Sequence, residues 1–190
     1  MFKVVSMSLL LFFAAQMSSS QTHSPQRVNE ESASSQTQNV PSMPSEEEIG
    51  ELLNKANEYV KTYRETFTTT KRSLDKAPTP GYYEKGMELS TQASDVISAI
   101  KKNGSTAYAL VGLIGVLDDM SLNAARASAA TMVVALGENK SNPKDNATQD
   151  FIDLAQAEKN CYDISELLLH ATLRYIAVEE TALRTLLNRQ

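Results

Sequence analysis

The sequence predicts an all-α protein, built as an antiparallel helical bundle of four to five helices with a long C-terminal helix and a disordered N-terminal segment. Apolar residues recur at steps of three and four through most of the chain after residue 45, the spacing that places side chains on one face of a helix. Trp is absent and only seven Gly occur in 190 residues, a composition that argues against a turn-rich β architecture.

The first 20 residues are typical of a signal peptide. Lys3 supplies a positive charge, Val4–Ala15 is an apolar core, and Gln16–Ser20 is polar with small residues at its end. The apolar core is shorter than the roughly 20 residues needed to span a bilayer, so a retained membrane anchor is the less favoured alternative. We therefore expect cleavage after Ser20 and a secreted or periplasmic protein.

Residues 21–44 are rich in Ser, Gln, Thr, Asn and Pro and contain few large apolar groups. Such a segment cannot bury enough surface to offset the entropy of ordering. The sequence thus predicts three parts: the signal peptide (1–20), a disordered linker (21–44) and a helical domain (45–190).

The first helix is expected to begin at Ser45, because Ser45 with Glu48 three residues later forms a capping box. It is expected to continue for about 30 residues and to end before Pro78-Thr79-Pro80-Gly81, since proline does not continue a helix. Its apolar positions share one face: Ile49, Leu53, Ala56, Val60, Tyr63, Phe67, Thr70 and Leu74.

The middle of the chain predicts three further helical segments. The first covers about Tyr83–Lys102 and ends at Asn103-Gly104, with Tyr83, Met87, Ala93, Ile97 and Ile100 inward. Residues 107–117 are apolar nearly all round and suit a buried core helix, and residues 121–136 form an alanine-rich helix. Asp118–Met120 either breaks these two segments apart or is a charged spot on one helix, and we favour the break. Residues 138–146 are expected to form a loop.

The last segment, residues 147–188, predicts one long helix. Asn160 followed by Asp163 could divide it, but the spacing continues without a slip, which favours continuity. Two apolar rows follow the helix, and other helices are expected to cover both. The first, which we call the seam, contains Leu154, Ala157, Cys161, Ile164, Leu168, Ala171, Tyr175, Val178 and Ala182. The second row contains Leu169, Leu173, Ile176, Leu183 and Leu187.

Charge and motifs exclude several classes of function. The net charge of -5 repels nucleic acid and anionic lipid, so no nucleic-acid partner is expected. Cys161 is the only cysteine and lies on the seam, which predicts a buried packing role and excludes an intrachain disulfide. His170 shares a polar helix face with Asp163, Glu166 and Arg174, which predicts an exposed charge ladder. No catalytic, metal or phosphate-binding motif is present, so no catalytic residue, cofactor or metal is predicted.

Three sequons for N-glycosylation, at Asn103, Asn139 and Asn146, lie in predicted loops. About two would arise by chance in this composition, so they do not identify a glycoprotein.

Three hypotheses for the function follow. The favoured one is a binding or scaffold protein outside the cytoplasm, without catalytic activity, that uses its apolar helix faces for a protein partner or a homodimer. The second is a membrane-active bundle that inserts residues 107–136 as a hydrophobic hairpin, although the acidic charge opposes it. The third is an enzyme with an unrecognised site that uses Cys161 or His170.

Overall fold

The computed structural model of the protein describes residues 42–138 and 147–188. The predicted signal peptide, residues 21–41 of the predicted linker, and the loop at 139–146 lie outside the described residues. The described residues are helical with no strand, which confirms the predicted all-α class. The helices are α2 (Glu46–Thr69), α3 (Lys71–Leu74), α4 (Tyr82–Asn103), α5 (Ala107–Glu138) and α6 (Ala147–Leu187).

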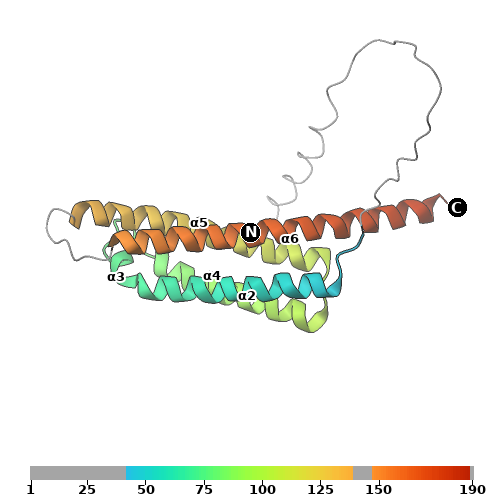
Figure 1. Ribbon diagram of the computed structural model, residues 1–190, viewed down its shortest axis with the longest axis horizontal. Coiled ribbons are helices and arrows are strands. Elements are labelled where there is room, and N and C mark those ends of the chain that lie inside the picture. Colours follow the sequence, from blue (N-terminus) through green and yellow to red (C-terminus); the bar gives the residue numbers. More distant parts are fainter. Residues whose placement is uncertain (1–41, 139–146, 189–190) are drawn as a thin grey trace, which may run out of the picture. The chain divides into compact units, whose positions relative to one another are not determined.

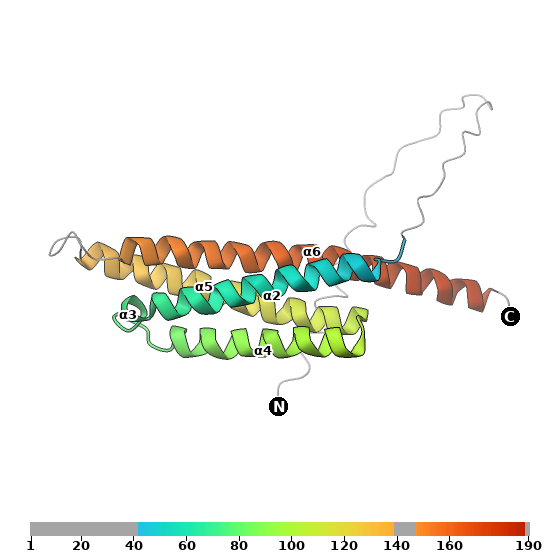
Figure 2. The same cartoon turned by 60° about the horizontal axis from the view of Figure 1, so that its bottom comes forward.

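The four long helices lie lengthwise beside one another (Figures 1 and 2), and α5 with α6 forms the most extensive pair. Hydrogen bonds show that neighbours run in opposite directions. Between α2 and α4, Lys101 donates to Asn54 at 2.8 Å and Arg64 to Ser90 at 3.1 Å, so the start of α2 meets the end of α4. Along α6, Arg174 pairs with Glu48 at the start of α2, while Asp150 accepts a hydrogen bond from Ser73 of α3, beyond the end of α2.

Three hydrogen bonds spread along the α5–α6 pair join the two helices. The hydroxyl groups of Ser105, just before α5, and Tyr175 are 3.0 Å apart, Ser165 donates to Asp118, and Ser128 donates to the backbone oxygen of Phe151 at 3.1 Å. These three bonds set an antiparallel register along most of the length of α5.

The first helix begins as predicted, because the Ser45 hydroxyl accepts a hydrogen bond from the Glu48 backbone N–H at 3.0 Å. It is shorter than predicted, since α2 ends at Thr69 and the short α3 follows. The hydroxyl groups of Thr69 and Thr70 both bond to the backbone oxygen of Thr66, in competition with the helical ladder. The predicted inward face is otherwise confirmed, and Tyr63, Phe67, Thr70 and Leu74 are buried.

The helix α4 has a wider buried face than predicted. Ala93, Ile97 and Ile100 are buried as expected, whereas Tyr83 and Met87, also expected inward, are only half-buried. Three residues not expected on this face are buried as well: Gly86, Leu89 and Ser90. A Cβ built on Gly86 would lie 2.5 Å from a ring carbon of Phe67, so the absence of a side chain there lets α2 and α4 approach closely. The turns on either side use glycine with positive φ, at Gly81 (97°) and Gly104 (89°).

The predicted break at Asp118–Met120 is wrong, because α5 is one helix from Ala107 to Glu138. Met120 is fully buried, and so are Leu117 and Ala124, three residues before and four after it. The core face therefore passes through this point without a slip, while the two aspartates lie on the exposed side.

A single continuous α5 also means that residues 107–136 form no hairpin in this structure. Ala107–Gly137 is long and apolar enough to cross a membrane by length and composition, a test that core helices of soluble proteins also pass. The expected core helix at 107–117 belongs to the core, but it is buried on one face only. Leu110, Leu113 and Leu117 are buried, but Tyr108 is 89 % exposed.

The final helix is continuous, as predicted, from Ala147 to Leu187. Its seam is buried as far as Tyr175, but Ala182 is exposed. The expectation that other helices cover the second row is wrong. All five of its members are exposed: Leu169, Leu173, Ile176, Leu183 and Leu187.

Candidate functional site

Cys161 lies inside the protein, where the seam predicted it. Its side chain is fully buried in the core shared with the other long helices. Burial raises the pKa of the thiol from 9.0 to about 12. A buried, protonated thiol is a poor nucleophile and a poor metal ligand, so the environment suits packing.

His170 lies on the outer surface of the same helix, as predicted. Its imidazole is 70 % exposed and lies 3.9 Å from the carboxylate of Glu166, one turn earlier in α6. Arg174, expected on the same ladder, instead pairs with Glu48 of α2. Nine residues separate Cys161 from His170, which at about 100° per residue places them on opposite sides of α6. The structure therefore does not bring them to a shared cleft.

Acidic residues do not gather into a metal site in the described part of the chain. No group of three or more His, Cys, Asp or Glu side chains there is placed to hold a metal ion. Apart from the Glu48–Arg174 pair, the ion pairs described above and below join residues of one helix, such as Lys159 with Asp163 and Arg184 with Glu180.

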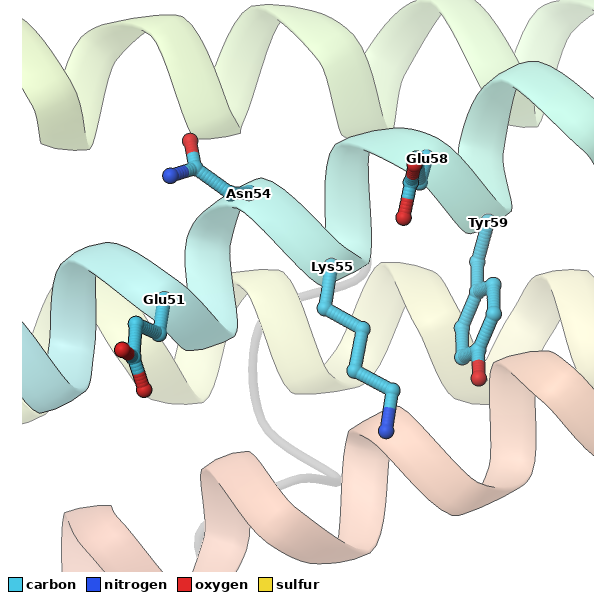
Figure 3. Close-up of a pocket in the computed structure, with 5 residues that line it drawn as sticks. All are labelled: Glu51, Asn54, Lys55, Glu58 and Tyr59. Atoms are coloured by element: carbon cyan, nitrogen blue, oxygen red, sulfur yellow. The ribbon is translucent and has the colours of Figure 1, made fainter.

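Figure 3 shows a hollow on the outer side of α2, lined by Glu51, Asn54, Lys55, Glu58 and Tyr59. All five residues come from one helix. The Lys55 amino group lies 5.7 Å from the centre of the Tyr59 ring, and both side chains extend towards α6 in the view. The hollow is an open surface, because four of its five lining residues are exposed to solvent: Glu51, Asn54, Lys55 and Glu58.

A more extensive feature surrounds the Asp118–Ser165 hydrogen bond. Val111 and Leu122, seven residues before and four after Asp118, return to its side of α5. In the same way, Tyr162 and Leu169 lie three before and four after Ser165. These four side chains are between 43 % and 58 % exposed. They form, with Leu173 and Ile176, an apolar surface along the α5–α6 contact that we call the outer face.

The outer face continues onto a part of α6 that no other described helix covers. Arg174 and Tyr175 are the last residues of α6 with a side-chain bond to another segment in the described structure: Arg174 bonds to α2, and Tyr175 to Ser105 just before α5. Beyond them α6 projects past the ends of its neighbours (Figures 1 and 2), and every residue from 179 to 188 is exposed. We call residues 176–187 the extension. Leu183, Leu186 and Leu187 there are between 60 % and 69 % exposed.

Exposure on this scale has an energetic cost. Burying a large apolar side chain completely contributes about 1.5–3 kcal/mol, so covering a half-exposed one contributes roughly 1 kcal/mol. Association of two proteins costs about 4–15 kcal/mol. One exposed leucine is therefore insignificant, whereas covering six such side chains on each of two partners contributes on the order of 10 kcal/mol, which is comparable with that cost.

The extension is helical throughout and continues the packed part of α6 as one helix.

Sequence reasoning found the second row but assigned it to the core. Charged residues within a row could have distinguished the two rows. Glu166 and Glu180 lie on the second row, whereas the seam has no charged member between Leu154 and Tyr175. The Tyr108 and Val111 surface of α5 was missed because that segment is apolar nearly all round. The sequon Asn103 is the exposed last residue of α4, and Asn139 and Asn146 lie outside the described residues.

The fold and surface together define an all-α protein with an uncovered apolar helix face. No family model, curated protein or solved structure matches this chain.

Proposed function

We propose that this chain is an exported, non-catalytic protein that binds another protein helix through the outer face and the extension of α6. In this proposal the long helices form an antiparallel four-helix bundle, whose role is to hold that surface rigid. The observation that carries the proposal is the second row, an apolar row at helical spacing that no described helix covers.

The bundle arrangement is supported by the directions of the hydrogen bonds between helices and by the common core. Residues of all four long helices belong to one cluster of buried apolar side chains. Antiparallel neighbours joined by short connections, such as residues 104–106 between α4 and α5, are typical of such bundles.

A helix-binding role is supported by geometry. Exposed apolar residues repeated at steps of three and four are the pattern by which one amphipathic helix packs on another. Contiguous exposed apolar surface on a soluble protein commonly marks such a contact.

Absence of catalysis is supported by the placement of the two reactive side chains, since Cys161 is buried and His170 is exposed on the opposite side. Export is supported by the signal-peptide pattern of residues 1–20. The export part is tested by measuring the intact mass of the protein recovered outside the cytoplasm. That mass should correspond to a chain that begins at Gln21. A mass that includes Met1–Ser20 would contradict it.

The binding part is tested by site-specific photo-crosslinking in the organism that makes the protein. A photoreactive phenylalanine derivative replaces Leu173 in one variant and Lys55 in a matched control. Leu173 lies in the second row, and Lys55 is an exposed residue of α2 outside it. We expect one discrete adduct from position 173 and none from position 55. No adduct from position 173, or equal adducts from both, would contradict the proposed function.

A further inference from the structure

We propose that the partner of the outer face is a second copy of this chain, bound antiparallel, so that the extension of each copy lies along residues 162–173 of the other. This proposal rests on the proposed function and names the occupant. The interface is isologous, and the two-fold axis passes close to Arg174 and Tyr175, where the extension begins.

The two-fold axis places the 12 residues of the extension, about 18 Å at 1.5 Å per residue, along the 12 residues 162–173 of the other copy. The helical spacing of the row also continues through both segments without interruption. Its members follow one another at steps of four and three: Tyr162, Glu166, Leu169, Leu173, Ile176, Glu180, Leu183 and Leu187. A single helix row of this kind is complementary to itself.

The charges on the row favour the antiparallel direction. In a parallel pair in register, Glu166 and Glu180 would each face the same residue of the other copy, and like charges in apposition are unfavourable. In the antiparallel pair, Leu183 is opposite Glu166 and Leu169 is opposite Glu180, so neither of these carboxylates faces the other.

Charged neighbours of the row become complementary in the same arrangement. Arg184 of the extension comes level with Asp163 and Glu166 of the second copy, while Glu180 comes level with His170. All these groups are exposed or partly exposed and now pair along their own helix, as Arg184 does with Glu180. Exposed pairs of this kind exchange partners at little cost.

The neighbouring helix leaves space for the extension. In the register set by the hydrogen bonds between α5 and α6, residues 162–173 of α6 lie beside about residues 108–119 of α5. A Cβ built at Gly112 or Gly115 there would meet no heavy atom within 4 Å other than the adjoining backbone of α5. Val111, which is 43 % exposed, supplies apolar contact on the same side.

The first experiment measures mass by sedimentation over a wide range of protein concentration. It uses the chain from Gln21, which keeps the whole compact unit Asn39–Gln190. We expect a reversible dimer. In the double variant Leu173→Glu, Leu183→Glu we expect the dissociation constant to rise at least about 30-fold. The matched control is Val133→Glu, a similarly exposed position of α5 at the opposite end of the α5–α6 pair, and it should leave the dimer unchanged.

The second experiment exchanges charges. Arg184→Glu alone should weaken the dimer, and Glu166→Arg added to it should restore most of the affinity. Residue 184 is exposed and lies beyond the last bonds to the other helices, so this variant tests the interface even if the leucine variants disturb folding. Restoration depends on the antiparallel direction, because position 184 lies far from position 166 in a parallel pair.

The third experiment measures the distance between spin labels on the two copies, with Asn188→Cys as the labelled position. The buried Cys161 is replaced by Ala. In the antiparallel pair residue 188 is level with residue 161 of the other copy, so the labels are separated by about 40 Å along the axis. A parallel pair brings them side by side.

Each outcome decides the proposal. A dimer that the row variants weaken, with the long label distance, supports it. A monomer at every concentration, a dimer indifferent to the row variants, or a short label distance overturns it. If the crosslink from position 173 joins a different protein while the purified chain is monomeric, the proposed function stands and the self-association fails.

Discussion

Asn123 of α5 donates its side-chain amide to the hydroxyl group of Tyr63 in α2, at 3.0 Å, deep between the helices. The same amide also donates to the backbone oxygen of Tyr82 at the start of α4, at 3.2 Å. Tyr63 is fully buried and Asn123 is 8 % exposed, so one polar residue joins three helices in the core. Burial raises the pKa of Tyr63, although the hydrogen bond from Asn123 opposes that rise.

Tyr63→Phe should therefore destabilise the protein although it keeps the ring. The variant removes one acceptor for the Asn123 amide, and a buried polar group without its partner costs about 1–3 kcal/mol. Urea unfolding followed by circular dichroism measures the loss. Tyr108→Phe removes the same atom from a residue that is 89 % exposed and serves as the control. Equal stability of the two variants would show that the buried bond is unimportant.

Gly86→Ala should also destabilise the protein, against the usual preference for Ala in a helix. Helix propensity alone favours Ala by roughly 0.5–1 kcal/mol. The new Cβ, however, would meet the Phe67 ring at 2.5 Å, and overpacking of this kind costs about 1–3 kcal/mol. Gly50→Ala is the matched control, since a Cβ there would meet nothing within 4 Å beyond the adjoining backbone of α2, and it should stabilise the protein. A stabilised Gly86→Ala would contradict the close approach of α2 and α4.

Periodicity alone predicted the helices well, because each helix must bury a face and burial imposes the spacing. The seam of α6 and the inward face of α2 were found in this way, and Ser45 marked the first helix because its capping bond is local. Gly86 was missed, since the need for a small residue comes from the Phe67 ring on another helix.

The errors have a common cause: the sequence of one helix does not show which of its faces the other helices cover. The aspartates at 118 and 119 suggested a break because their exposed side could not be known before the partner helix was placed. The second row resembles a core row in composition, and only the positions of α2 and α5 leave it uncovered. The candidate surface therefore follows from tertiary packing, while its apolar members were visible in the sequence.

Cys161 should make the stability of the protein fall with rising pH in the alkaline range. Its folded pKa of about 12 lies above its ordinary value of 9.0, so the folded state keeps the proton that the unfolded state loses. The contribution is complete below about pH 9 and is lost as pH rises towards 12. Between about pH 8 and about pH 10 the free energy of unfolding of the native protein should fall by about 1.4 kcal/mol more than that of Cys161→Ala.

Urea unfolding at the two pH values measures this difference, and the comparison of slopes removes the packing cost of the smaller alanine. A thiol reagent gives an independent check, because Cys161 should react slowly in the native protein and rapidly after unfolding. Identical pH dependence in both proteins, or rapid native labelling, would contradict the buried thiol.

Glu48 should make the stability of the protein fall as the pH is lowered in the acid range, opposite to the effect of Cys161. Hydrogen bonding from Arg174 is the largest cause that lowers the pKa of Glu48 below its ordinary value of 4.5, and the Ser45 backbone N–H adds to it. A lowered pKa stabilises the folded state above pH 4.5, and the contribution is lost as pH falls through the folded pKa.

Glu48→Gln should thus be less stable than the native protein at neutral pH, and the gap should close in acid. Urea unfolding at a series of pH values measures the gap. Glu51→Gln is the control for the loss of charge near the helix start, because Glu51 is an exposed residue of the same helix. A gap that stays constant down to strongly acid pH would show that Arg174 does not stabilise the ionised carboxylate.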